Sequence, residues 1–176
     1  MIEEIIKPET DLEKQLTSDP ELIAGLEWGK PRNGHPEGLV IYHVEELLKN
    51  IDTFFPEQRE ELRLIAIIHD AFKYKVDRGK TREGENHHGM IARRFAERYI
   101  TNPNLLDVIE LHDDAYNCWC KGIRTTWEKA EERANKLIQR LGGNINLYLA
   151  FYFCDNYSGK KEATCYSWFN NFVHKK

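Results

Sequence analysis

The stretch LIAIIHDAFK, residues 64–73, ends a run of apolar side chains with a histidine beside an aspartate. Counting back from His69, apolar residues stand at i−3, i−4 and i−7, which together form the buried stripe of a helix. His69 therefore points toward the core. A neutral imidazole next to an ionised carboxylate is a ligand pair well suited to a divalent metal.

The same arrangement recurs along the chain, because each of five predicted helices carries a metal-capable side chain in line with its apolar stripe. These side chains are His43, His69, His88, His112 and Asp155. A single histidine on an apolar face is usually a satisfied core residue, whereas a buried carboxylate costs several kcal/mol unless it has a cation or strong hydrogen bonds. Five such coincidences favour one metal centre where the helices meet.

Two adjacent histidines, His87 and His88, compete for the role of ligand on the fourth of these segments. His87 would share a mixed polar face with Arg94, whereas His88 is in register with four apolar residues of the same helix. The periodicity therefore favours His88, although the sequence leaves both open.

Helical periodicity runs along the whole chain, and β-branched alternation never persists over five residues. The sequence predicts an all-α fold, a single-domain helical bundle over residues 1–176 with a metal site in its core. The ligand-bearing helices are expected at about 36–50, 56–70, 87–100, 103–113 and 145–156. Residues 74–85 are expected to form a mobile loop, and residues 115–123 an irregular aromatic segment.

Composition limits the partners of this protein. A net charge of −4 argues against general nucleic-acid binding and against binding to anionic membranes. No apolar run reaches the roughly 20 residues that span a bilayer, and the first residues lack the features of a signal peptide. We expect a cytoplasmic protein that does not bind membranes, and a homo-oligomer is compatible with the sequence.

The charge is unevenly distributed. Residues 1–50 carry 11 acidic and 5 basic side chains, whereas residues 71–98 carry 8 basic and 4 acidic ones. The basic stretch begins directly after the His-Asp pair, and it includes Arg78, Lys80 and Arg82. It is either a solvated surface or a field that draws an anionic substrate toward a metal.

The ordered set His43, His69-Asp70 and Asp155 resembles the H…HD…D signature of the HD-domain superfamily of metal-dependent phosphohydrolases. The resemblance covers about residues 35–160. Lys73 matches the lysine that follows the HD pair in that family. The segment HPEG at residues 35–38 is similar to one in HD domains related to the tRNA nucleotidyltransferase group, and CDNYSG at residues 154–159 resembles the closing helix.

The resemblance implies one ion bound by His43, His69, Asp70 and Asp155. In the two-metal branch of the family, Asp70 would bridge to a second ion held by His88 and His112. The chain departs from the pattern at residue 113, which is an aspartate where a second histidine would follow His112. A mixed nitrogen and oxygen ligand set favours Mn, Fe, Co, Ni or Zn over Mg, so one or two divalent ions per chain are expected.

The expected activity is metal-dependent hydrolysis of a phosphoester or phosphoanhydride in a nucleotide or another small phosphorylated metabolite, with metal-activated water as the nucleophile. Lys73 is the first candidate for a phosphate contact. Glu46 lies one turn from His43 and would orient a ligand or form a salt bridge, and His35 would line the pocket entrance. A di-iron oxygenase of HD fold and a nucleotide-sensing module without turnover are the alternative functions.

Overall fold

The computed structural model describes residues 2–31, 38–159 and 163–175. These residues form α-helices joined by short 3-10 turns and no β-strand, and Gly29 and Leu39 make one isolated bridge. The prediction of an all-α fold is confirmed. None of the described helices is both long enough and apolar enough to cross a membrane.

The helices follow one another with short connections, many of them one to five residues long. The α-helices are α1 (Ile2–Ile6), α2 (Asp11–Ser18), α3 (Pro20–Leu26), α4 (Val40–Phe54), α5 (Arg59–Ile68), α6 (His88–Ala96), α7 (Pro103–Leu111), α8 (Asp114–Arg124), α9 (Trp127–Leu141), α10 (Ile145–Asn156) and α11 (Thr164–His174). The 3-10 turns are η1 (Pro56–Gln58), η2 (Lys73–Lys75), η3 (Gly84–Asn86) and η4 (Gly142–Asn144).

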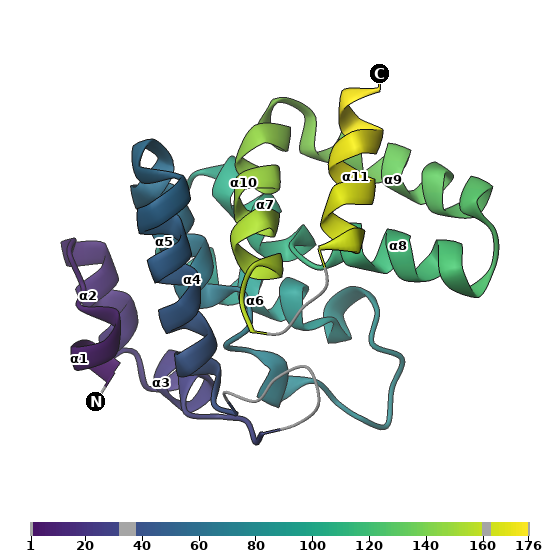
Figure 1. The fold of residues 1–176 in the computed structure, drawn as a ribbon. Coiled ribbons are helices and arrows are strands. Elements are labelled where there is room, and N and C mark those ends of the chain that lie inside the picture. Colours follow the sequence, from purple (N-terminus) through teal and green to yellow (C-terminus); the bar gives the residue numbers. More distant parts are fainter. Residues whose placement is uncertain (1, 32–37, 160–162, 176) are drawn as a thin grey trace.

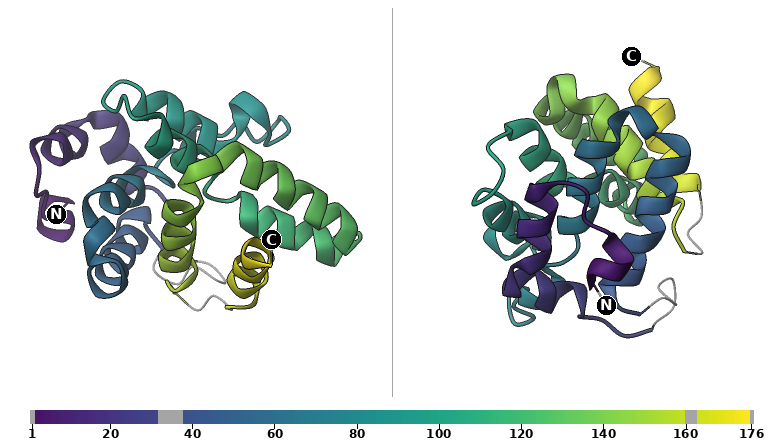
Figure 2. Two further views of the ribbon diagram at one scale, coloured as in Figure 1. Left: turned by 90° about the horizontal axis from the view of Figure 1, so that it is seen from above. Right: turned by 90° about the vertical axis from the view of Figure 1, so that its left-hand side faces the viewer.

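Helices α4, α5 and α10 form the centre of the bundle (Figure 1). The short helices α1, α2 and α3 lie at one end, and the α8–α9 hairpin lies at the other, as Figure 2 shows from above. The pair α6–α7 packs beside α5, and α11 packs on α8 and α10. The five segments that carry the predicted ligands therefore surround the middle of the molecule.

The central helices are buried because their sequences are apolar where they meet. Every residue from Leu62 to Ile68 of α5 is buried, and so are the apolar residues Val40, Val44, Leu47, Leu48 and Ile51 on one side of α4. Helix α10 is apolar on nearly all sides, and it lies between α4, α5 and α11. Burial of each large aliphatic side chain contributes about 1.5–3 kcal/mol, so the site is built on well-stabilised helices.

The helix predicted over residues 56–70 is shorter in the structure. Helix α5 ends at Ile68, and His69 is its C-cap residue, so the His-Asp pair lies in the turn that follows. This turn packs tightly against α3, where a Cβ atom on Gly25 would lie 1.7 Å from the carbonyl oxygen of Ala71. A residue larger than glycine at this position would displace the turn that carries Asp70.

The prediction of an irregular segment at residues 115–123 is wrong, because these residues belong to α8. Their aromatic and cysteine residues have modest helix propensity, and tertiary packing overrides it. Ala115, Cys118 and Gly122 are buried, and α8 packs along α9. A Cβ atom on Gly122 would lie 2.4 Å from the ring of Trp127, so glycine permits this close approach.

Candidate metal centre

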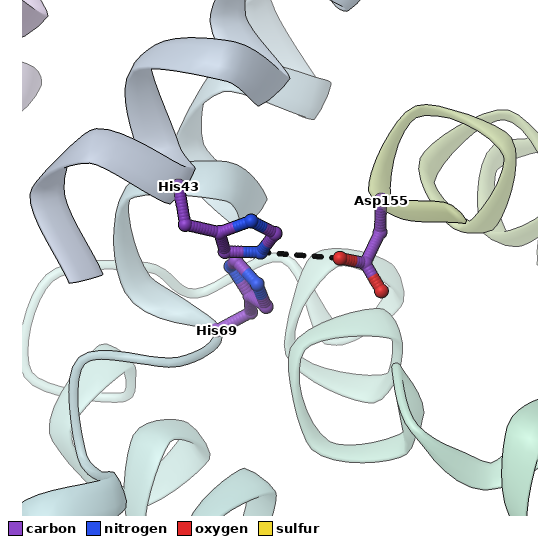
Figure 3. Close-up of side chains that lie close together, drawn as sticks. All are labelled: His43, His69 and Asp155. Atoms are coloured by element: carbon purple, nitrogen blue, oxygen red, sulfur yellow. Dashed lines mark ion pairs between the residues drawn. The ribbon is translucent and has the colours of Figure 1, made fainter. Parts of the chain in front are cut away.

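The first cluster of the site joins three helices from distant parts of the sequence. His43 comes from α4, His69 from the end of α5 and Asp155 from α10 (Figure 3). His43 Nε2 lies 3.1 Å from Asp155 Oδ1. One ligand atom from each of the three residues lies within 4.8 Å of the other two, so the group could hold a metal ion.

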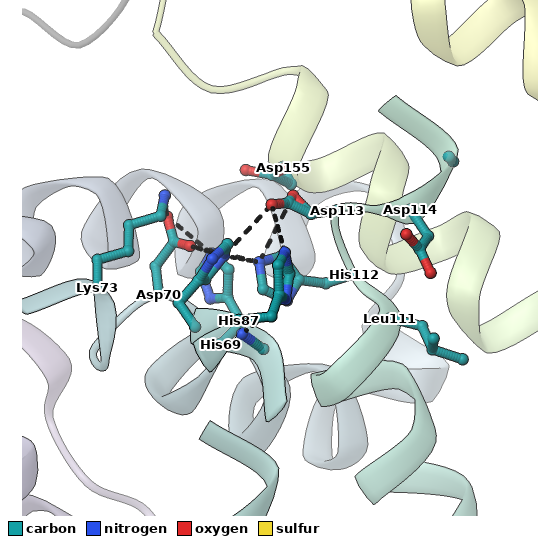
Figure 4. A network of polar contacts seen from close by, with 12 residues as sticks. His69, Asp70, Lys73, His87, Leu111, His112, Asp113, Asp114 and Asp155 are labelled. Atoms are coloured by element: carbon teal, nitrogen blue, oxygen red, sulfur yellow. Dashed lines mark hydrogen bonds and ion pairs between the residues drawn. The ribbon is translucent and has the colours of Figure 1, made fainter. Parts of the chain in front are cut away.

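The second cluster consists of Asp70, His88 and His112. Figure 4 shows Asp70 and His112 beside His69 of the first cluster. His88 Nε2 and His112 Nε2 are 3.0 Å apart. Asp70 Oδ1 lies 3.3 Å from His112 Nε2 and 3.5 Å from His88 Nε2. All three residues are at least nine-tenths buried.

The carboxylate of Asp70 faces both clusters, one oxygen toward each. Oδ1 points to the second cluster, whereas Oδ2 lies 3.6 Å from His69 Nε2 and 3.9 Å from His43 Nε2. A carboxylate placed in this way is suited to bridge two ions. The two clusters are therefore one continuous site, with Asp70 between its halves.

Helix ends set the orientation of two of the imidazoles. His69 and His112 each follow the last residue of a helix, and each Nδ1 contacts the carbonyl oxygen three residues earlier, Ala66 at 2.9 Å and Ile109 at 2.8 Å. The last carbonyls of a helix lack intrahelical donors, so an imidazole N–H satisfies them. When each ring is neutral with its proton on Nδ1, its Nε2 presents a lone pair to the site, which is the arrangement that metal-binding histidines adopt.

His43 is oriented by a serine that the sequence analysis did not identify. The hydroxyl of Ser158 donates to the carbonyl of Asp155 at 2.6 Å, and its oxygen lies 3.3 Å from His43 Nδ1. Because the serine proton is already committed, its oxygen accepts from Nδ1–H. His43 Nε2 is thereby directed toward Asp155.

Two buried polar atoms of the site have no hydrogen-bond partner among the described residues, His69 Nε2 and Asp70 Oδ1. The imidazole nitrogens near Asp70 Oδ1 are 3.3 Å or more away, longer than the about 2.7–2.9 Å of a strong charge-assisted hydrogen bond. Leaving such groups unsatisfied costs about 1–3 kcal/mol each, and more for a charge. The donor set and these two atoms fit a divalent cation.

The protonation of the site follows from burial and from neighbouring charges. Burial lowers the pKa of His69 to about 3, so this imidazole is neutral. Burial also opposes the charge on His112, but the neighbouring carboxylates of Asp70 and Asp113 outweigh it and raise the pKa of His112 to about 9. For Asp70, burial is outweighed by Lys73 and the surrounding histidines, which hold its pKa well below the ordinary value.

The structure separates the roles of the two adjacent histidines. His87 is the N-cap of α6, and its Nδ1 accepts from the backbone N–H of Gly89 at 3.2 Å. The proton of the neutral ring therefore lies on Nε2, which faces Asp113 at 3.7 Å. His88, in contrast, places Nε2 beside Asp70 and His112, as the periodicity favours.

Asp113 is a site residue that sequence analysis treated as a departure from a pattern. Its Oδ2 lies 3.4 Å from His88 Nε2, and its Oδ1 lies 3.9 Å from His112 Nε2. With His87 and His88 it forms a third group that could hold a cation. Its position directly after His112 is the feature of the sequence that could have identified Asp113 as a site residue.

Tyr148 holds the corner that carries His112 and Asp113, and sequence analysis did not identify this role. Its hydroxyl is fully buried and donates to the carbonyl of Leu111, at 3.0 Å, while accepting the backbone N–H of Ala115 at 3.0 Å. These bonds join the end of α7 to the start of α8. The tyrosine therefore fixes the turn on which two site residues lie.

Lys73 and Glu46 have different surroundings. Lys73 Nζ lies 2.5 Å from Asp70 Oδ2, and the lysine borders the hollow over the site. The carboxylate of Glu46 accepts the backbone N–H of Gly159 at 2.8 Å, so it ties the segment after α10 to α4. In this position Glu46 stabilises the loop that carries Ser158.

The three loop cations also differ in position. Two hollows open beside the site, one bordered by His43 and Asp70 and the other by His87 and His88. Arg78 borders both and Arg82 borders the second, whereas Lys80 forms an ion pair with Asp77 at 3.2 Å and borders neither. His35 lies outside the described residues, so its predicted place at the pocket entrance is untested.

Comparison of the chain with models of known protein families, with curated proteins and with solved structures finds no match. The likeness to the HD-domain superfamily thus rests on the chain's own residues. What the structure itself establishes is an all-helical fold with buried His/Asp groups that could hold a metal ion.

Proposed function

We propose that this protein is a metal-dependent phosphohydrolase of the HD-domain type, which acts on a phosphoester or phosphoanhydride of a small metabolite. The observation that carries this proposal is the position of Asp70, whose buried carboxylate faces two histidine clusters and has an oxygen without a hydrogen-bond partner among the described residues. Such a carboxylate is stabilised by cations on both sides.

His43, His69, Asp70 and Asp155 would hold one ion, and Asp70, His88 and His112 would hold a second. Asp113 supplies a further carboxylate beside His88. A divalent ion in such a site lowers the pKa of water and neutralises negative charge that develops on phosphorus. The mixed nitrogen and oxygen donors favour Mn, Fe, Co, Ni or Zn.

The chain contributes charge and orientation around this centre. Lys73 neutralises the Oδ2 side of Asp70 and also borders the open hollow, where its ammonium group can contact an oxygen of the substrate phosphate. Ser158 and the carbonyls of Ala66 and Ile109 hold three imidazoles with Nε2 directed inward. The substrate phosphate therefore meets a site whose ligands are already oriented.

The test is elemental analysis of the purified protein, followed by a hydrolysis screen over nucleotides and model phosphoesters with each divalent ion in turn. We expect one or two bound ions per chain and release of inorganic phosphate that depends on the ion. Tight binding of a nucleotide without any product would replace this proposal with a sensor. Oxygen-dependent turnover with an iron signal would replace it with a di-iron oxygenase.

A further inference from the structure

Two hollows meet beside the Asp70 site. The histidine hollow has a volume of about 420 Å³ and is bordered by His43, Asp70 and Lys73. The arginine hollow has a volume of about 890 Å³ and is bordered by His88, Asp113 and several arginines. Trp28, Lys73 and Arg78 border both, so a single ligand can extend from one hollow into the other.

The arginines of the arginine hollow are of two kinds. Arg133 pairs with Asp114 at 2.6 Å, and Arg140 pairs with Glu110 at 2.5 Å, so both are neutralised within the fold. Arg78 and Arg82 form no ion pair with any residue in the described part of the chain. These two guanidinium groups therefore leave a positive charge available at the surface of the hollow.

The loop that carries these two arginines is held in shape by one side chain. The amide of Asn86 donates to the carbonyls of Asp77 and Thr81, at 3.0 and 2.8 Å, and accepts the N–H of Asp77 at 2.9 Å. Within this loop Lys80 forms an ion pair with Asp77. The loop thus presents two of its three cations to the hollow, and it neutralises the third.

A guanidinium group presents a planar set of donors that matches a phosphate group and binds it by two parallel hydrogen bonds. Glu83 and Asp113 also border the arginine hollow. Because Asp113 faces His88 and His112, its charge is directed toward the site and away from a ligand on the arginines. An anion in this hollow can therefore meet both Arg78 and Arg82, whose combined charge exceeds that of the neighbouring Glu83.

We propose that Arg78 and Arg82 form a second phosphate site, and that the substrate is a small metabolite with at least two phosphate groups. The phosphate that is cleaved lies at the Asp70 site, and the second lies on the two arginines. This inference rests on the proposed function for the cleaved group. The second phosphate site itself requires no turnover.

The first experiment measures binding of inorganic pyrophosphate to the protein as purified, by titration calorimetry at fixed salt. Arg78→Ala and Arg82→Ala should each weaken binding by about tenfold or more, because each removes charge-assisted hydrogen bonds. Arg94→Ala is the matched control, since Arg94 is an exposed arginine paired with Glu85 and Glu97. An equal loss in Lys80→Ala would overturn the proposal, because it would show a general effect of loop charge.

The second experiment compares KM for a monophosphate ester and for a bisphosphorylated substrate. We expect the two arginine variants to raise KM for the bisphosphorylated substrate about tenfold, with little change for the monophosphate.

Unchanged KM values for both substrates would overturn the inference and leave the proposed function in place. Weaker pyrophosphate binding in both variants, without hydrolysis of any phosphoester, would support the second site and overturn the proposed function. Preference for an oligonucleotide over small bisphosphates would also overturn the inference.

Discussion

The molecule contains two buried charged clusters that differ in how they are satisfied. At one end of the bundle, Glu13 accepts from Arg63 Nε at 2.7 Å and from Arg63 Nη2 at 2.9 Å, and both residues are at least 97% buried. The backbone N–H of Glu9 and the carbonyl of Ile6 complete this pair. In the centre, Asp70 is also buried, yet its Oδ1 has no hydrogen-bond partner among the described residues.

The difference separates a buried charge that the chain itself satisfies from one that a bound cation could satisfy. The Glu13–Arg63 pair is complete within the chain, so it joins the N-terminal helices to α5 and needs nothing from solvent. The Asp70 site has several acceptors that converge without an equal number of donors. Such a site is stable only when a proton or a metal ion supplies the missing positive charge.

The largest effect is expected for Asp70→Ala and His69→Ala. Each removes a proposed ligand, so we expect loss of metal content and a fall in the rate of phosphate release of more than about a hundredfold. This effect is larger than the one expected when a residue that only orients a ligand is removed. Elemental analysis and turnover assays measure both. Asp52→Ala, at an exposed carboxylate paired with Arg59, should change neither. Full activity in a metal-free Asp70→Ala protein would contradict the assignment.

For the Glu13–Arg63 pair we expect the opposite result, a loss of stability without a loss of metal. Arg63→Met leaves the Glu13 carboxylate buried alone, and it should lower the free energy of unfolding by about 3–5 kcal/mol. The double variant Glu13→Leu, Arg63→Met should recover most of this loss, because it removes both charges. Chemical denaturation measures the stability, and the metal content per folded chain should stay unchanged. Loss of metal in the double variant would show that the two clusters are not independent.

A smaller effect is expected where an orienting contact is removed. Ser158→Ala takes away the acceptor of His43 Nδ1–H, and we expect metal affinity to fall about 10–100-fold with little change in stability. Competition with a chelator gives the affinity. Ser18→Ala, at an exposed serine on α2, is the control. Equal affinities for both variants would mean that Ser158 has no orienting role.

The weakest of the four effects is a dependence on pH. The pKa of His112 is raised to about 9 in the metal-free protein, so this group stabilises the fold below its unfolded pKa of about 6.5, and this contribution is lost as the pH rises toward 9. Metal binding must displace the same proton. We therefore expect release of about one proton per chain on metal binding near pH 7, measured by calorimetry in buffers of different ionisation enthalpy. Uptake of a proton would contradict this.

The sequence indicated the candidate ligands because burial and polarity conflict at those positions. A carboxylate such as Asp155 in line with an apolar stripe is costly, so the pattern of His43, His69, Asp70, His88, His112 and Asp155 could be identified from periodicity. The convergence of these residues in the structure agrees with that expectation. The helical class was predicted on the same grounds and is confirmed.

Other parts of the site depend on contacts between distant segments. Ser158 and Tyr148 carry no periodic signal. Their roles follow from contacts with distant residues, because Ser158 contacts His43, 115 positions earlier in the chain, and Tyr148 contacts Leu111, 37 positions earlier. Lys80 and Arg82 are both loop cations in the sequence. The structure distinguishes them, because Lys80 forms an ion pair with Asp77. Residues 115–123 form a helix because α9 and α11 cover one face of it.

The sequence by itself determined that the chain is helical and which imidazoles and carboxylates face inward, because side-chain periodicity and the cost of burying charge are local properties. The tertiary structure decided which Asp70 oxygen faces which cluster, which nitrogen of each histidine is directed inward, and which arginines have no ion pair within residues 2–31, 38–159 and 163–175. These properties depend on distances between helices, and no local pattern of residues encodes them.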